Sequence, residues 1–159
     1  MATALAGALP AAAHQPVDLG TRDTTPARGP LLVDGTVSYA VTAEVRQGER
    51  RGFRFALDEG DTLAMQLLIF DEDPANRLPS WQLPRVTVTS PSGKKTRLVV
   101  NERTEFYEPY GGRTYLYLSR LQEDAVAGVY RVNVSGRSTS PVVAVVAVGY
   151  REVRGEVRR

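Results

Sequence analysis

The sequence predicts an all-β protein, an antiparallel β-sandwich or jelly roll of about eight strands. Apolar and polar residues alternate over short stretches that are separated by Gly, Pro and Asp turns. No comparable stretch has the i, i+3, i+4, i+7 apolar spacing and capping residue of an amphipathic helix. With 159 residues, 42% hydrophobic and 24% charged, the chain suits one domain that buries its own core.

The expected strands lie within residues 35–149, which we predict to be the sandwich domain. Alternation or an apolar run marks residues 37–45, 53–57, 62–69, 86–88, 98–100, 115–118, 130–134 and 142–148. The apolar residues Leu63, Met65, Leu67 and Ile69 are two positions apart and should all face the opposite sheet. Tyr130 shares a face with two valines, which predicts a buried ring whose hydroxyl has a backbone partner.

Three further segments flank this domain. Residues 1–13 are uncharged, rich in Ala and Leu and end in three alanines, which predicts a signal-peptide remnant and a secreted or periplasmic protein. Residues 14–34 have no apolar period and predict an extended linker. Residues 150–159 alternate valines with charges, as in a charged C-terminal edge strand or tail.

Only two of the 20 basic residues are Lys, a bias typical of GC-rich bacteria.

Composition argues against several classes of function. The sequence has no Cys, which excludes disulfides, thiolate metal sites and a cysteine nucleophile. The net charge of +2, with acids and bases interleaved, predicts no nucleic-acid partner. No apolar run is long enough for a membrane span. The only His, His14, precedes the domain, so a Ser/His/Asp triad is not expected and neither is an enzyme.

Acidic residues gather directly after the strand at residues 62–69. Asp71, Glu72 and Asp73, with Asn76 nearby, offer the oxygen ligands that calcium accepts. They lack the D-x-D-x-D-G spacing of a calcium loop, so a solvated turn is the other interpretation. We therefore expect no cofactor, with calcium as the one candidate.

Aromatic residues indicate where a partner would bind. Trp81 lies in the irregular segment 76–84, and Tyr107 and Tyr110 lie in the expected loop 106–112. Tyr115 and Tyr117 should point outward if the leucines that alternate with them point inward. These five side chains predict a ligand-binding platform for a polysaccharide or an extracellular protein. Alternatively, Trp81 closes an open end of the sandwich and the tyrosines are ordinary strand residues.

Short motifs in the domain resemble a known family. AGVYRVNVSG at residues 127–136 is similar to the closing strands of bacterial pre-peptidase C-terminal domains. FRF at residues 53–55, EGDTL at 59–63 and the SPSG turn at 90–93 resemble earlier parts of the same pattern, so the likeness covers residues 35–149. The resemblance implies a secreted jelly roll that is a non-catalytic accessory of peptidases or other hydrolases.

The sequence thus predicts a secreted or periplasmic β-sandwich module with a binding or structural role. The alternatives are a calcium-dependent hydrolase that uses the acidic turn, or a fragment of a larger secreted peptidase or hydrolase.

Overall fold

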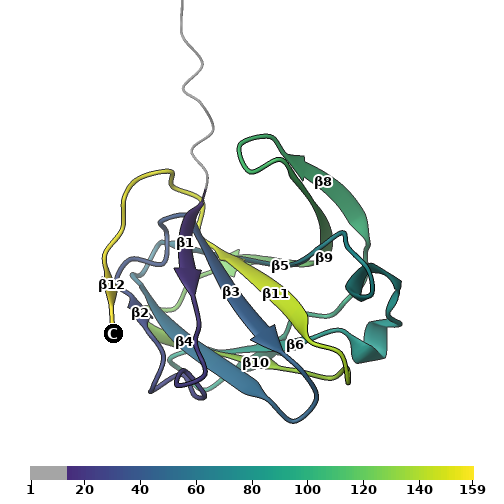
Figure 1. Cartoon of the computed structure of the whole chain (residues 1–159). Coiled ribbons are helices and arrows are strands. Elements are labelled where there is room, and N and C mark those ends of the chain that lie inside the picture. Colours follow the sequence, from purple (N-terminus) through teal and green to yellow (C-terminus); the bar gives the residue numbers. More distant parts are fainter. Residues whose placement is uncertain (1–13) are drawn as a thin grey trace, which may run out of the picture.

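The computed structural model describes residues 14–159, which form a sandwich of two six-stranded β-sheets (Figure 1). Sheet one has the order β1-β3-β11-β5-β9-β8 and sheet two the order β12-β2-β4-β10-β6-β7. The strands of sheet one are β1 Gln15–Asp18, β3 Tyr39–Val45, β11 Val142–Val148, β5 Thr62–Phe70, β9 Arg113–Asp124 and β8 Thr104–Glu108. Those of sheet two are β12 Val157–Arg158, β2 Leu31–Leu32, β4 Arg50–Leu57, β10 Gly128–Ser135, β6 Arg85–Thr89 and β7 Lys95–Arg97. The predicted signal-peptide remnant, residues 1–13, lies outside the described residues.

Eight of these strands have the arrangement of a jelly roll. Four of them, β3, β11, β5 and β9, are neighbours in sheet one, and β4, β10, β6 and β7 are neighbours in sheet two. Every pairing within these two sets is antiparallel. The predicted β-sandwich is therefore confirmed. Two short 3₁₀ helices, Ala75–Arg77 and Ser80–Gln82, connect β5 to β6.

The strand count and the purely antiparallel pairing predicted from the sequence are wrong. The described residues contain twelve strands, and the four outside the jelly roll are β1, β2, β8 and β12. Both β1 with β3 and β2 with β4 pair in parallel. The seventh strand occupies residues 95–97 rather than the expected 98–100, although Leu98 is buried. The stretch expected to be a loop at 106–112 begins within β8.

Residues 14–34 are part of the sandwich and do not form a linker. Their strands are only four and two residues long, too short for alternation to show in the sequence. The buried Asp23 holds the turn between them: its carboxylate accepts from the backbone N–H of Gly20 at 2.8 Å and pairs with Arg159 at 3.2 Å. Its backbone carbonyl accepts from the N–H of Gly52 in β4 at 2.7 Å. These polar contacts, together with the buried Val17, Leu19 and Leu32, hold the segment against the two sheets.

The C-terminal segment, residues 149–159, crosses from one sheet to the other. It leaves β11 at Gly149, whose φ of +81° disfavours other residues, and a Cβ there would lie 2.0 Å from the carbonyl oxygen of Val37. The segment ends in β12, which pairs with β2 at the edge of sheet two. Residues 157 and 158 thus form the short, charged edge strand.

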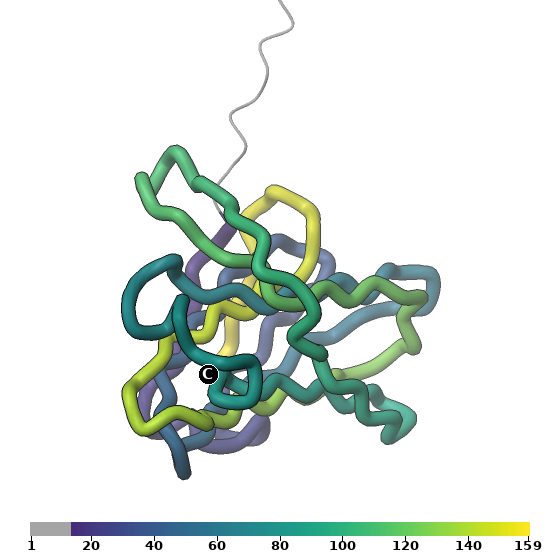
Figure 2. The backbone as a smooth tube through the Cα atoms, turned by 90° about the vertical axis from the view of Figure 1, so that its right-hand side faces the viewer, coloured from purple at the N-terminus to yellow at the C-terminus, as the bar shows by residue number. Residues whose placement is uncertain are grey.

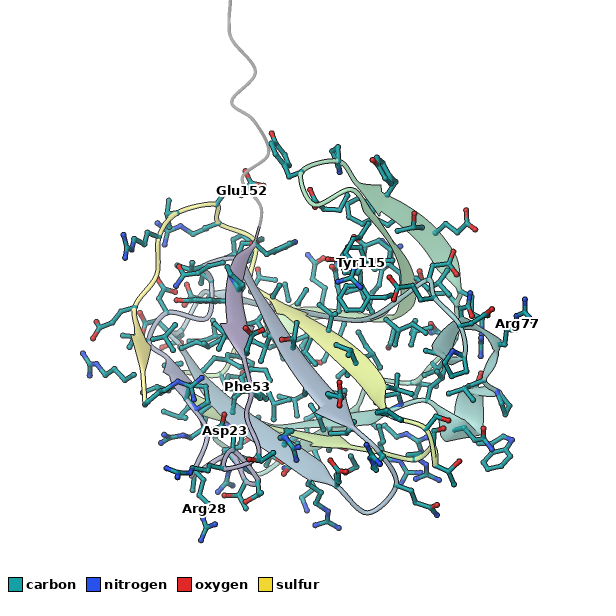
Figure 3. The ribbon with its side chains drawn as sticks, in the orientation of Figure 1. Asp23, Arg28, Phe53, Arg77, Tyr115 and Glu152 are labelled. Carbon is teal, nitrogen blue, oxygen red and sulfur yellow. The ribbon has the colours of Figure 1, made fainter. Side chains whose placement is uncertain are left out.

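The core lies between the sheets and consists of their inward-facing residues. Leu63, Met65, Leu67 and Ile69 are all buried there, as their spacing predicts. The rings of Phe55 and Tyr130 are stacked with centroids 5.1 Å apart, and the ring of Phe53, labelled in Figure 3, lies 6.4 Å from that of Phe55. The Tyr130 hydroxyl accepts from the backbone N–H of Val126 at 2.8 Å, which confirms the expected backbone partner. Among residues 14–159, no helix is long and apolar enough to cross a membrane.

We expect Leu67→Ala to destabilise the protein by about 2–5 kcal/mol, because it leaves a cavity in a fully buried site. The measurement is the free energy of unfolding from chemical denaturation. Val99→Ala is the matched control: Val99 is 57% exposed, and its truncation should cost less than about 0.5 kcal/mol. Equal losses for the two variants would contradict the assigned register of β5.

Tyr130→Phe should cost about 0.5–1.5 kcal/mol, because it removes only the acceptor for the Val126 N–H and keeps the stacked ring. Thermal and chemical unfolding both measure this loss. An unchanged melting temperature would show that the hydrogen bond contributes nothing to stability.

Candidate functional site

The outer face of sheet one is concave. The β8–β9 hairpin rises from the end of the sheet and curls over its outer side, as Figures 1 and 2 show. Leu68, Val145 and Ala147 are buried on this side and form an apolar cluster separate from the main core. The partly buried residues packed against them are Ala40, Phe70, Tyr115, Tyr117 and Val143. We call this surface the concave face.

A β-bulge sets which side chains of β9 reach the concave face. Leu67 pairs with Ser119 whereas Leu68 pairs with Tyr117, so Leu118 is an extra residue in β9. Leu118 and Ser119 are both buried, although they are adjacent in the chain. Tyr117 and Arg120 consequently project from the same face three positions apart. The sequence predicted the outward direction of Tyr117 but gave no signal for the bulge.

Four rings form one aromatic cluster inside the curl. Tyr115 lies 5.0 Å from Phe70 and 6.5 Å from Phe106, and Phe106 lies 5.6 Å from Tyr117, measured between ring centroids. Figure 3 shows Tyr115 between β11 and the hairpin. Burial raises the pKa of the Tyr115 hydroxyl, so this group stays a neutral donor and acceptor. The sequence prediction missed Phe70, which follows the expected strand, and Phe106, which lies in the expected loop.

Two arginines cover rings of this cluster. The guanidinium of Arg113 lies 3.5 Å from the centroid of Phe70 and pairs with Glu72 at 2.9 Å. That of Arg120 lies 3.9 Å from the centroid of Tyr117 and pairs with Glu102 at 3.0 Å. The hydrogen bond from Arg120 holds the pKa of Glu102 below its usual value, so this carboxylate stays charged. The cluster therefore presents guanidinium edges together with aromatic rings.

A shallow pocket of about 270 Å³ adjoins the cluster on the concave face. Its polar side chains are Gln66, Gln122 and Arg120, and the rest of its lining is Ala64, Met65, Leu121, Ala147 and Gly149. Gln66 is the cross-strand partner of Arg120, and Ala64 that of Gln122. Arg120 belongs to both the pocket and the aromatic cluster, so the two make one continuous site.

The remaining predicted aromatic residues lie elsewhere. Tyr107 is 60% exposed but alternates with Phe106 and so projects from the other side of β8. Tyr110 is 59% exposed at the hairpin tip, where the carboxylate of Glu108 accepts from its backbone N–H at 2.7 Å. The predicted five-residue platform is therefore wrong: only Tyr115 and Tyr117 come together, and they are half-buried.

Trp81 lies on the second 3₁₀ helix with 65% of its side chain surface exposed. Its carbonyl accepts from Nε of Arg137 at 3.0 Å. None of the ring pairs found within residues 14–159 includes its indole. Trp81 neither closes the end of the sandwich nor joins the tyrosines.

The acidic turn is not arranged as a calcium site. Asp71 accepts from the side-chain amide of Asn76 at 3.0 Å, Glu72 pairs with Arg113, and Asp73 pairs with Arg77 at 2.9 Å. Each carboxylate thus has its own partner, and in the described part of the chain no three His, Cys, Asp or Glu residues are placed to hold a metal ion. The predicted calcium ligands Asp71, Glu72, Asp73 and Asn76 thus form a turn in which Glu72 and Asp73 are ion-paired and Asp71 is hydrogen-bonded to Asn76.

Comparison with models of known protein families and with curated proteins found no match to this sequence.

Because the acids of this turn are separately paired, adding calcium at about 5 mM should leave the melting temperature unchanged. Magnesium at equal ionic strength is the control for screening by salt. A rise of several degrees with calcium alone would show that the turn rearranges to bind the ion.

Proposed function

We propose that the protein is a non-catalytic β-sandwich module that binds a polysaccharide on the concave face. The observation that carries this proposal is the continuity of the aromatic cluster with the pocket through Arg120. A sugar has apolar ring faces and a rim of hydroxyl groups. A surface that joins aromatic rings to amides and a guanidinium complements both parts.

The chemistry of the pocket supports binding rather than catalysis. Gln66 and Gln122 each offer an amide donor and an amide acceptor, which suit sugar hydroxyls in either role. The residues that line the pocket include no carboxylate and no imidazole, the groups that general acid–base catalysis uses most. At about 270 Å³ the pocket is smaller than typical ligand pockets and suits one sugar unit of a longer chain.

A secreted or periplasmic location and an accessory role are part of the same proposal. The apolar segment at residues 1–13 and the resemblance of residues 35–149 to pre-peptidase C-terminal domains support them. A module of this kind would hold a partner enzyme, or the protein itself, close to a polymeric substrate.

The test compares retention of the protein on cellulose, xylan, glucomannan and peptidoglycan with that of Gln66→Ala/Gln122→Ala. The double variant should lose at least about tenfold in affinity for the polymer that binds the wild type, since it removes both amides from the pocket. Gln47→Ala/Gln82→Ala is the matched control, because neither residue lines the pocket, and it should bind as the wild type does.

The melting temperature of each variant shows whether it is folded. Retention of the wild type on none of the polymers, or equal retention of both double variants, would overturn the proposal. Binding of collagen in place of every polysaccharide would replace the proposed ligand with a protein.

A further inference from the structure

The outer face of sheet two is basic. In β4, β10, β6 and β7 every second residue points away from the core, as their burial patterns show. The cationic residues at these outward positions are Arg50, Arg54, Arg131, Arg85, Lys95 and Arg97. Between them lie the short polar residues Asn133, Ser135 and Thr87, whereas Thr89 is buried. We call this surface the basic face.

No negative charge balances these cations within the sheet. The four strands contain no Asp or Glu. None of the six cations takes part in an ion pair among residues 14–159, whereas Arg113, Arg120 and Arg151 of other segments all do. The chain as a whole has 20 basic and 18 acidic residues, which are interleaved along the sequence. On this face of the folded protein, by contrast, the basic residues are gathered without acidic ones.

The register places these cations close together. Arg54 and Arg131 are direct cross-strand partners, and Ser135 lies between Arg50 and Arg85 in neighbouring strands. Neighbouring strands are about 4.8 Å apart, and like charges in directly opposite positions destabilise a sheet. A bound anion would relieve this repulsion.

Individual donors on the basic face also lack partners. The Nε–H groups of Arg54 and Arg85 are buried and have no hydrogen-bond acceptor within the described residues. Desolvation, with the nearby charges of Arg137 and Arg97, holds the pKa of Arg85 below its ordinary value. An N–H donor without an acceptor costs free energy, so these two guanidinium groups lie in an unfavourable environment.

We propose that the basic face binds an acidic polysaccharide, a linear polymer that carries carboxylate or sulfate groups. Arginine pairs bidentately with such groups, and Thr87 and Ser135 between the arginines offer hydroxyls to sugar oxygens. This site is independent of the concave face, which lies on the opposite side of the sandwich (Figure 1).

The surface suits other polyanions less well. Single-stranded nucleic acids stack on successive aromatic rings, and none of the outward positions of these strands is aromatic. A flat four-stranded sheet does not enter the major groove of DNA, which admits a helix or a two-stranded ribbon. Membrane surfaces favour Trp and Tyr among the basic residues, whereas here Thr, Ser and Asn separate them.

The probe is alginate, a polymer of carboxylate-bearing sugars, with dextran as the uncharged control. Isothermal titration calorimetry at about 50 mM NaCl should detect alginate binding, and the affinity should fall roughly tenfold or more at about 200 mM because salt screens exposed charges. Arg97→Gln/Arg131→Gln should weaken binding by at least about tenfold. Arg77→Gln/Arg154→Gln lowers the net charge equally but lies outside these strands, and should change the affinity by less than about twofold.

Absence of alginate binding at the lower salt concentration, or equal loss in both double variants, would overturn the proposal. Tighter binding of a single-stranded oligonucleotide or of phosphatidylglycerol vesicles than of alginate would overturn it in favour of that partner. Neither arginine of the test variant lies on the concave face, so a failure of this experiment does not affect the proposed function. Likewise, a failure of the test of the concave face does not affect the proposal for the basic face.

Discussion

The close packing of two apolar sheet faces is the constraint on which the rest of the structure depends. Side chains alternate across a strand, so each residue that the core requires on the inside fixes its neighbours on the outside. In β5 the inward set ends at Ile69, which places Phe70 on the concave face. In β10 the buried Val132 places Arg131 and Asn133 on the basic face. The alternation that packs the core therefore also determines which residues form the concave face and which form the basic face.

The outer faces of the two sheets differ in the residue types at their outward-facing positions. Sheet one curls, and its outer side gathers aliphatic and aromatic residues that partly bury one another. Sheet two carries cations at its outward positions, where Arg54 and Arg131 are cross-strand partners and repel each other. One scaffold thus offers a shallow pocket beside an aromatic cluster on one side and a basic surface on the other.

Much of the fold could be predicted from the sequence because most strands are long enough for alternation to show. The buried set from Leu63 to Ile69 and the hydrogen-bonded Tyr130 follow from that alternation. By contrast, β1 and β2 are too short to show alternation, although Val17 and Leu32 are buried in the core. The bulge at Leu118 depends on how β9 meets β5 and is a tertiary effect.

The candidate sites were harder to predict for the same reason. The sequence marks Tyr115 and Tyr117, but their partner Phe106 comes from another strand and depends on the pairing of β8 with β9. Adjacent acids suggested calcium, yet Glu72 pairs with Arg113, which lies 41 residues away. The net charge of +2 does not predict the basic face, because the total charge of a chain does not say on which side of a sheet its charged residues lie.

The parallel pairings at the start of the chain have a consequence for solubility. A single short segment places β1 against the free edge of β3 and β2 against the free edge of β4. Unpaired edges of this kind recruit strands from other molecules and lead to aggregation. Residues 15–32 therefore cover one long edge of each sheet, and the strands left at these edges, β1 and β12, are only four and two residues long, which limits the backbone available for such pairing.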